Sequence, residues 1–188
     1  MYIDPGHGGS DTGALGKGMF EKDVVLNAHK IQSLLTKHYE NVEVKMSRTS
    51  DVAKSLAQRT NEANAWMADF YLHCKASNRF THGYEDNIHN SNSASSLTAI
   101  FQDIMHTEIM RVNQLKDCGQ KKANFYVLRK MNMPAILTEN GFIDNGQDSA
   151  LMKDSSWIQK VAQRHVNGLI KTFNLKCKPV ILKLFNRS

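Results

Sequence analysis

Short strand-like segments alternate with amphipathic helical segments along this chain, and this alternation constrains the fold more than any other feature. Apolar residues recur at helical spacing in the stretches 22–39, 52–67, 97–112 and 156–170. Runs rich in β-branched, aromatic and aliphatic residues lie between them, at 2–4, 42–46, 68–74, 82–90, 124–129 and 135–139. The pattern predicts a single α/β domain in which a mostly parallel, twisted sheet of about six strands is flanked by helices on both faces.

This predicted domain extends over residues 1–175. With 188 residues, 41% of them hydrophobic, the chain is long enough to bury one core of ordinary size. Ser156 and Gln159 have the spacing of a capping box, which predicts the start of the last helix. Residues 176–188 lose the alternating pattern, so we expect them to form a tail or the remnant of a linker.

Charge and cysteine content exclude several classes of protein. Lys and Arg number 24 against 18 Asp and Glu, and the net charge of +6 favours an anionic partner without choosing one. The cysteines, Cys74, Cys118 and Cys177, are too widely spaced for a disulfide framework or a zinc ribbon. The apolar runs are far shorter than the roughly 18 residues of a membrane span. No secretory leader is expected, because Met1 is followed within a few residues by sequence typical of an active site.

Three predicted strands end in ionisable side chains where only more apolar sequence was needed. Asp4 and His7 follow the first strand, His73 follows FYL, and Glu139 follows AILT. Ligands of open α/β sheets gather at the carboxyl ends of strands, so we expect these side chains to converge on one crevice. Two imidazoles and one carboxylate around an open fourth position form a recognised catalytic zinc arrangement. A metal site would therefore explain the pattern, with His7 and His73 as the imidazoles.

Other polar features have different interpretations. The glycine-rich loop after the first strand could cradle a phosphate, but LGKGM lacks the Ser or Thr of a GK[ST] motif, and nucleotide binding is not favoured. Arg59 lies on an apolar stripe with Leu56 and Ala63, which favours a buried salt bridge or cap that supports the sheet. The remaining histidines are expected to be ordinary core or surface residues: His29, His38, His82, His89, His106 and His165.

Several motifs, taken together, resemble one known family. They are IDPGHGGSDTGA, Glu21 after the glycine-rich loop, Arg59-x4-Asn64 before ADFYLH, Gly83-x-Glu85, and NFYVLRKMNMPAILTENGFIDN. In this order and spacing, from Tyr2 to about Leu175, the chain resembles the zinc-dependent N-acetylmuramoyl-L-alanine amidases. The resemblance is to the catalytic domain shared by bacterial autolysins, sporulation lysis amidases and phage endolysins.

The resemblance implies that His7, Glu21 and His73 are zinc ligands and that Glu139 is the catalytic carboxylate. A carboxylate at a helix start, as at Glu21, is favoured by the helix dipole. Glu139 follows a hydrophobic strand, so partial desolvation would raise its pKa and suit it to moving a proton from water to the leaving amine. The implied reaction is hydrolysis of the amide bond between N-acetylmuramic acid and the L-alanine of the peptidoglycan stem peptide.

Four residues depart from the family's pattern. Cys74 and Lys75 stand where small or amide residues usually follow the second histidine, and Asn87 and His89 stand where aromatic residues are common. An ammonium beside a zinc ligand would lower metal affinity, and a thiol there would compete for metal or oxidise. Lys75 shares a face with His73 only if the strand continues past Cys74. Two alternatives therefore stay open: a catalytically weak or silent cell-wall-binding module, and a zinc peptidase that cuts elsewhere in the stem peptide.

The resemblance also implies where the protein acts and with what. The expected partner is peptidoglycan, with no nucleic acid and no membrane insertion, and the protein is expected to be a monomer. It would act outside the cell, at the bacterial wall. Since no leader is expected, it would reach the wall on release by lysis, or the chain has been trimmed.

Overall fold

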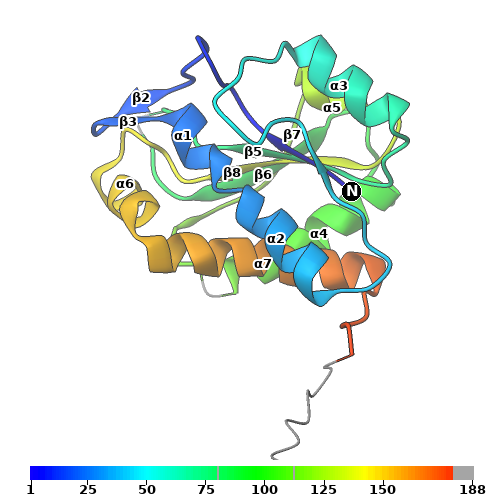
Figure 1. Cartoon of the computed structure of the whole chain (residues 1–188). Coiled ribbons are helices and arrows are strands. Elements are labelled where there is room, and N and C mark those ends of the chain that lie inside the picture. Colours follow the sequence, from blue (N-terminus) through cyan, green and yellow to red (C-terminus); the bar gives the residue numbers. More distant parts are fainter. Residues whose placement is uncertain (80, 112, 180–188) are drawn as a thin grey trace, which may run out of the picture.

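The computed structural model describes residues 1–79, 81–111 and 113–179. A central six-stranded sheet runs in the order β4-β1-β5-β8-β6-β7, and β2 and β3 form a separate two-stranded ribbon (Figure 1). The strands are β1 (Tyr2–Pro5), β2 (Leu15–Gly16), β3 (Met19–Phe20), β4 (Lys45–Met46), β5 (Tyr71–Lys75), β6 (Tyr84–His89), β7 (Asp117–Ala123) and β8 (Ala135–Asn140).

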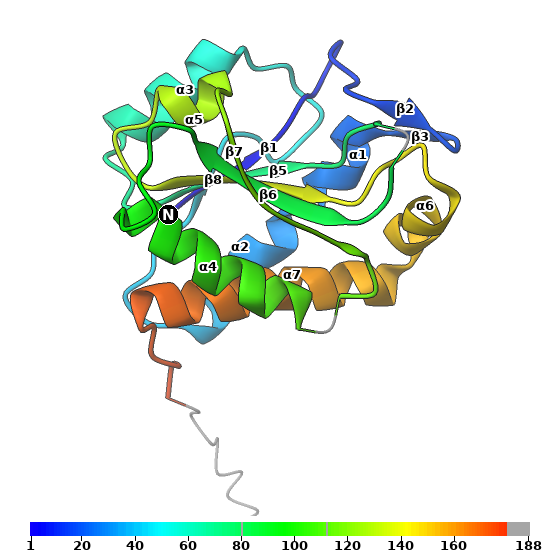
Figure 2. The same cartoon turned by 180° about the vertical axis from the view of Figure 1, so that it is seen from behind.

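Helices cover both faces of this sheet. Helices α3 and α5 lie on one face, and α2, α4 and α7 lie on the other, as the two opposite views show (Figure 1, Figure 2). The helices are α1 (Glu21–Leu26), α2 (His29–His38), α3 (Leu56–Ala65), α4 (Leu97–Met110), α5 (Tyr126–Arg129), α6 (Gly146–Lys153) and α7 (Ser155–Phe173). The predicted fold class, a mostly parallel sheet of about six strands between two helical layers, is confirmed.

Neighbouring strands of the central sheet are parallel except β6 and β8, which pair antiparallel. Because β1, β5 and β8 are adjacent and parallel, their carboxyl ends meet at one edge of the sheet. Asp4 is paired in register with His73, and Lys75 with Glu139. The sheet thus brings together the strand ends in which the sequence placed ionisable residues.

Side-chain alternation along β5 separates two hydrophobic cores. Tyr71 packs in the core beneath α3 and α5, whereas Leu72 and Cys74 pack in the larger core beneath α2, α4 and α7. Successive side chains of a strand point to opposite faces, so His73 and Lys75 share the face of Tyr71. The strand does continue past Cys74, which is the condition under which Lys75 lies beside His73.

Some predicted elements were wrong. Residues 124–129 do not form a strand but contain α5. The sixth strand of the sheet is instead β7, an edge strand whose side chains are mostly polar. The stretch 22–39 is divided into α1 and α2. The last helix is capped by Asp154, whose carboxylate accepts from the backbone N–H of Ser156, so Ser156 is not the cap. Val112, expected at the end of the third helix, lies outside the described residues.

The segment after α7 pairs with the end of α2. The backbone N–H of Glu40 donates to Lys176 O at 2.9 Å, and that of Lys178 donates to His38 O at 2.8 Å. Of the predicted tail, residues 180–188 lie outside the described part of the chain. Among the described residues, no helix has both the length and the apolar character needed to cross a bilayer.

Candidate active site

His7 lies in the loop that leaves β1, in a backbone conformation that is rare for a residue with a side chain. Its φ angle is 58°, in the left-handed region. The imidazole Nδ1 contacts the Asp11 carboxylate at 2.9 Å, and Nε2 lies 3.2 Å from Oε2 of Glu21. The loop therefore holds the ring by one nitrogen and turns the other toward Glu21.

Glu21 is the first residue of α1, and its side chain is buried. Its two oxygens accept hydrogen bonds from the backbone N–H groups of Ala14 at 2.9 Å and Ala76 at 3.0 Å. Burial disfavours the charged carboxylate, but contacts with His7 and the Lys75 ammonium outweigh burial and hold the pKa of Glu21 well below its usual value. The residue is thus a buried, ionised carboxylate that faces cations and donors.

His73 is fixed by a buried carboxylate on the neighbouring strand. Its Nδ1 lies 2.7 Å from Oδ2 of Asp4, and the same oxygen accepts a hydrogen bond from the Tyr71 hydroxyl. The other carboxylate oxygen, Oδ1, pairs with the Arg59 guanidinium. Burial opposes ionisation of Asp4, yet His73 and Arg59 hold its pKa well below the ordinary range. With Nδ1 engaged, Nε2 is the His73 nitrogen left free to bind a ligand.

Arg59 has the structural role that the sequence predicted. Its guanidinium is buried and donates to Pro5 O at 2.8 Å and to His7 O at 2.6 Å. α3, which carries it, begins at a capping box formed by Ser55 and Gln58. Arg59 thereby ties the loop that carries His7 to the sheet.

Glu139 ends β8 at the same edge, and its carboxylate is held by Ser77. The Ser77 hydroxyl donates to Oε1 at 2.8 Å and its backbone N–H donates to Oε2 at 3.1 Å. Burial raises the pKa of Glu139 to about 7, although the nearby Lys75 charge and the Ser77 hydrogen bonds oppose the shift. A carboxyl group with a pKa near neutrality can both take and give a proton at physiological pH.

Lys75 lies within this group of side chains. Its Nζ contacts Nε2 of His7 and lies 3.0 Å from Oε1 of Glu21. Across the sheet it is the register partner of Glu139. In the described part of the chain, no three His, Cys, Asp or Glu side chains are grouped closely enough to hold a metal ion.

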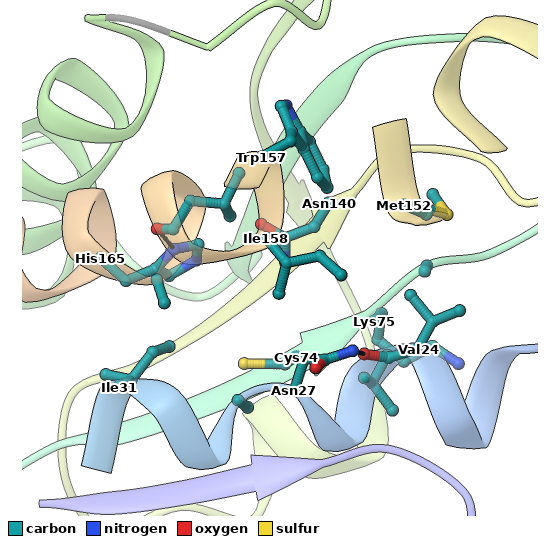
Figure 3. A pocket seen from close by; sticks show the side chains of 15 residues that line it. Val24, Asn27, Ile31, Cys74, Lys75, Asn140, Met152, Trp157, Ile158 and His165 are labelled. Carbon is teal, nitrogen blue, oxygen red and sulfur yellow. Dashed lines mark hydrogen bonds between the residues drawn. The ribbon is translucent and has the colours of Figure 1, made fainter. Parts of the chain in front are cut away.

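Cys74 points away from this group, so the expectation that its thiol would compete for metal or oxidise was wrong. The side chain packs in the core beside α1 and α2, and burial raises the thiol pKa to about 12. It lines a cavity of about 60 Å³ between α1, α2 and α7, with Cys74 and Lys75 on one side and Trp157 and His165 on the other (Figure 3). A buried thiol of this kind is protonated and unreactive.

Comparison with known proteins identifies the family. The family model described as N-acetylmuramoyl-L-alanine amidase matches residues 1–171. The chain belongs to this amidase family. The predicted enzyme class, an N-acetylmuramoyl-L-alanine amidase, is confirmed.

Relatives and solved structures agree with this assignment. The amidase is 48% identical over 176 residues to the N-acetylmuramoyl-L-alanine amidase CwlM of Bacillus licheniformis, covering 93% of this chain and 69% of that protein. It is 46% identical to the sporulation-specific N-acetylmuramoyl-L-alanine amidase of Bacillus subtilis strain 168, covering 94% and 69%. The catalytic domain of CwlV from Bacillus (Paenibacillus) polymyxa var. colistinus superimposes with a TM-score of 0.87 at 29% identity, covering 93% and 98%.

The amidase brings some of the predicted site residues into contact and leaves others apart. His7 and Glu21 touch, and Lys75 touches both. His73 and Glu139 lie at the same sheet edge, on neighbouring strands, and each is held by its own partner, Asp4 or Ser77.

Two supporting residues were not assigned these roles from the sequence. Asp4 was noted only as an ionisable strand end, and Ser77 carried no signal. Their roles depend on contacts between segments that are distant in the chain, since Asp4 and His73 are 69 residues apart and Ser77 and Glu139 are 62 apart.

Proposed function

We propose that this amidase hydrolyses the amide bond between N-acetylmuramic acid and the L-alanine of the peptidoglycan stem peptide. In this proposal His7, Glu21 and His73 hold zinc, and Glu139 carries the proton. Residues 1–175 form the catalytic domain, and the enzyme acts at the bacterial wall, outside the cytoplasm, as its named relatives suggest.

The chemistry of the donor set fits zinc. Two imidazoles and one carboxylate leave the fourth position of a tetrahedral ion open for the reaction. Nδ1 of His7 and Nδ1 of His73 are both engaged by carboxylates, of Asp11 and Asp4, which is the usual support of a ligating histidine. The Glu21 carboxylate already faces the cationic Lys75 ammonium. The site is thus built to offer donors to a positive charge.

Zinc, when bound there, would polarise the scissile carbonyl and lower the pKa of a water molecule. The chain's own residues supply the rest. Asp4 fixes the His73 ring, and the Arg59 guanidinium holds the carbonyl of His7, so both imidazoles stay in place. A Glu139 carboxylate oxygen takes a proton from the attacking water and then gives it to the nitrogen of the leaving L-alanine. Ser77 keeps that carboxylate oriented through both transfers.

The observation that carries this proposal is the position of Glu139. A buried carboxyl group with a pKa of about 7 lies at the sheet edge that also presents His73, on the strand next to it. General bases work best when their pKa is close to the working pH. Burial raises the pKa of any buried carboxyl group, so it is the position of Glu139 on the strand beside His73 that ties this group to the site.

Digestion of purified sacculi followed by mass spectrometry tests the proposal. The expected products are glycan strands with free lactyl groups and stem peptides that begin with L-alanine. Excess chelator should abolish their formation and added zinc should restore it. Full turnover with no metal in the protein would rule out the zinc mechanism, and new termini within the stem peptide would identify a peptidase instead.

One observation favours the second candidate, a wall-binding module with little or no hydrolysis. Lys75 contacts two of the three side chains proposed to hold zinc, His7 and Glu21. A module of this kind would sediment with sacculi and release no peptide, whether or not zinc is added. The intact His7, Glu21, His73 and Glu139 favour the enzyme.

A further inference from the structure

The Lys75 side chain is held inside the site and not in solvent. Only 17% of it is exposed, and its stem passes over Gly6, where an added Cβ would lie 3.1 Å from Cδ of Lys75. Strand pairing with Glu139 fixes the backbone, and alternation along β5 fixes the face. Gly6 thus leaves room for the lysine stem on its way to these contacts.

Lys75 contacts two of the three side chains that zinc would need, His7 and Glu21. An imidazole nitrogen has one lone pair, and with Nδ1 of His7 engaged by Asp11, the Nε2 lone pair faces the ammonium. Oε1 of Glu21 is 3.0 Å from the same ammonium. A monovalent and a divalent cation cannot share these donors at contact distance, because their repulsion in a largely buried site is strong.

We infer that Lys75 is an internal competitor of zinc: its ammonium occupies ligand atoms of His7 and Glu21 in the metal-free enzyme and leaves them when zinc binds. This inference rests on the proposed function. The Lys75 ammonium makes the metal-free enzyme more stable than it would be if the buried Glu21 carboxylate had no cationic partner. It also makes zinc binding weaker than the donor set alone would allow.

Lys75→Met and Lys75→Asn test the inference without reference to activity. Met keeps the stem over Gly6 and removes the charge, and Asn removes both. We expect both variants to bind zinc at least about tenfold more tightly than the parent in competition against a calibrated chelator, since a like charge in contact with the site is gone. In excess chelator both should melt below the parent, and zinc should raise their melting temperatures by more than it raises the parent's.

Lys171→Met is the matched control. Lys171 also places an ammonium on a buried carboxylate, that of Glu108, but between α7 and α4 and away from the site. The variant loses the same unit of charge from a buried carboxylate, although Lys171 is more exposed than Lys75 and Glu108 keeps Arg111 as a partner. It should melt at a lower temperature both with and without zinc, and its zinc affinity should equal the parent's.

Acetylation of lysines, followed by mass spectrometry, measures the displacement of Lys75 in the parent protein, without any substitution. Lys75 should react several times faster with zinc bound than in chelator, while Lys171 should react at the same rate in both. Equal zinc affinity in the parent and both Lys75 variants, or a Lys75 acetylation rate that zinc does not change, would overturn the inference and leave the proposed function standing. Absence of saturable zinc binding in the parent and the variants alike would instead overturn the zinc site itself.

Discussion

The Asp4 carboxylate accepts a hydrogen bond from Nδ1 of His73 across 2.7 Å, and both side chains are buried. The two residues are register partners on β1 and β5, so the sheet fixes their distance. A ring whose Nδ1 donates presents Nε2 as its free lone pair. Asp4 therefore determines which nitrogen of His73 is turned toward the site.

The first prediction concerns Asp4→Asn, which keeps the shape of the side chain but removes its charge. Zinc affinity should fall by about 10- to 100-fold, the usual effect of losing the residue that orients a ligand. The free energy of unfolding should fall by about 3–5 kcal/mol, because the buried Arg59 charge loses its partner. Chelator competition and urea denaturation measure the two effects.

Tyr71→Phe is the control for this variant. It removes another hydrogen bond to Asp4 and leaves the pair of Asp4 and His73 in place. Zinc affinity should stay within about twofold of the parent's while stability falls by about 1 kcal/mol. Equal loss of zinc in the two variants would mean that Asp4 acts on the site only through stability.

Glu139→Gln should separate proton transfer from metal binding. The amide keeps the size of the side chain and cannot take a proton, so hydrolysis of muropeptides should fall by about 10²-fold or more. Zinc content should stay near that of the parent, whereas His7→Ala should lose both zinc and activity. If Glu139→Gln loses its zinc as well, Glu139 is a ligand and Glu21 becomes the candidate base.

The strand ends could be predicted from the sequence because burial there is nearly complete. The first residues of β5 and of β8 are all buried, so an ionisable residue after each apolar run stands out. β7 could not be predicted in this way, since it lies at the edge of the sheet and most of its side chains are exposed or half-buried. Its sequence, DCGQKKA, carries neither an apolar run nor an alternation.

The segment NFYVLR was misassigned because one helical turn and a short strand have the same apolar content. Val127 and Leu128 of α5 are adjacent and both buried against the face of α3, which a strand of the sheet would not allow. The direction of Lys75 was equally undetermined, because it depends on whether β5 pairs beyond Cys74. Pairing of Lys75 with Glu139 is a tertiary contact between residues 64 positions apart in the chain.

His165 should make the enzyme less stable in weak acid. The ring is buried on α7, its Nε2 has no hydrogen-bond partner within the described residues, and burial lowers its pKa to about 4. Above the ordinary histidine pKa of about 6.5 the ring is neutral in both states and has no effect on stability. As the pH falls from about 6.5 toward 4, the unfolded chain takes up a proton that the folded chain does not, so stability is lost.

The size of this effect can be measured by urea denaturation at pH 7 and pH 5. The loss due to His165 between these values should be on the order of 2 kcal/mol. His165→Gln cannot titrate, so its loss over the same interval should be smaller by that amount. Asp86 and Asp117 raise the pKa of His106 despite its burial, so His106 makes the folded state more stable as the pH falls. His106 is present in both proteins, so its effect cancels in the comparison. If the free energy of unfolding fell equally with pH in the parent and in His165→Gln, His165 would not be the group responsible for this loss.

Gly13→Ala tests whether the loop around His7 must approach it without a side chain. Gly13 has a φ angle of +64°, and an added Cβ would lie 2.5 Å from Cδ2 of His7 and 2.8 Å from Oε2 of Glu21. Gly18, at φ +76°, has no atom within 4 Å of an added Cβ, so Gly18→Ala introduces backbone strain without a steric clash. That strain is about 1–2 kcal/mol, and we expect it in both variants by urea denaturation. Only Gly13→Ala should also displace the His7 ring and weaken zinc binding, by tenfold or more on the scale of about 1.4 kcal/mol per decade. Equal zinc affinity in the two variants would show that the loop can move aside, and that the close approach of Gly13 does not position His7.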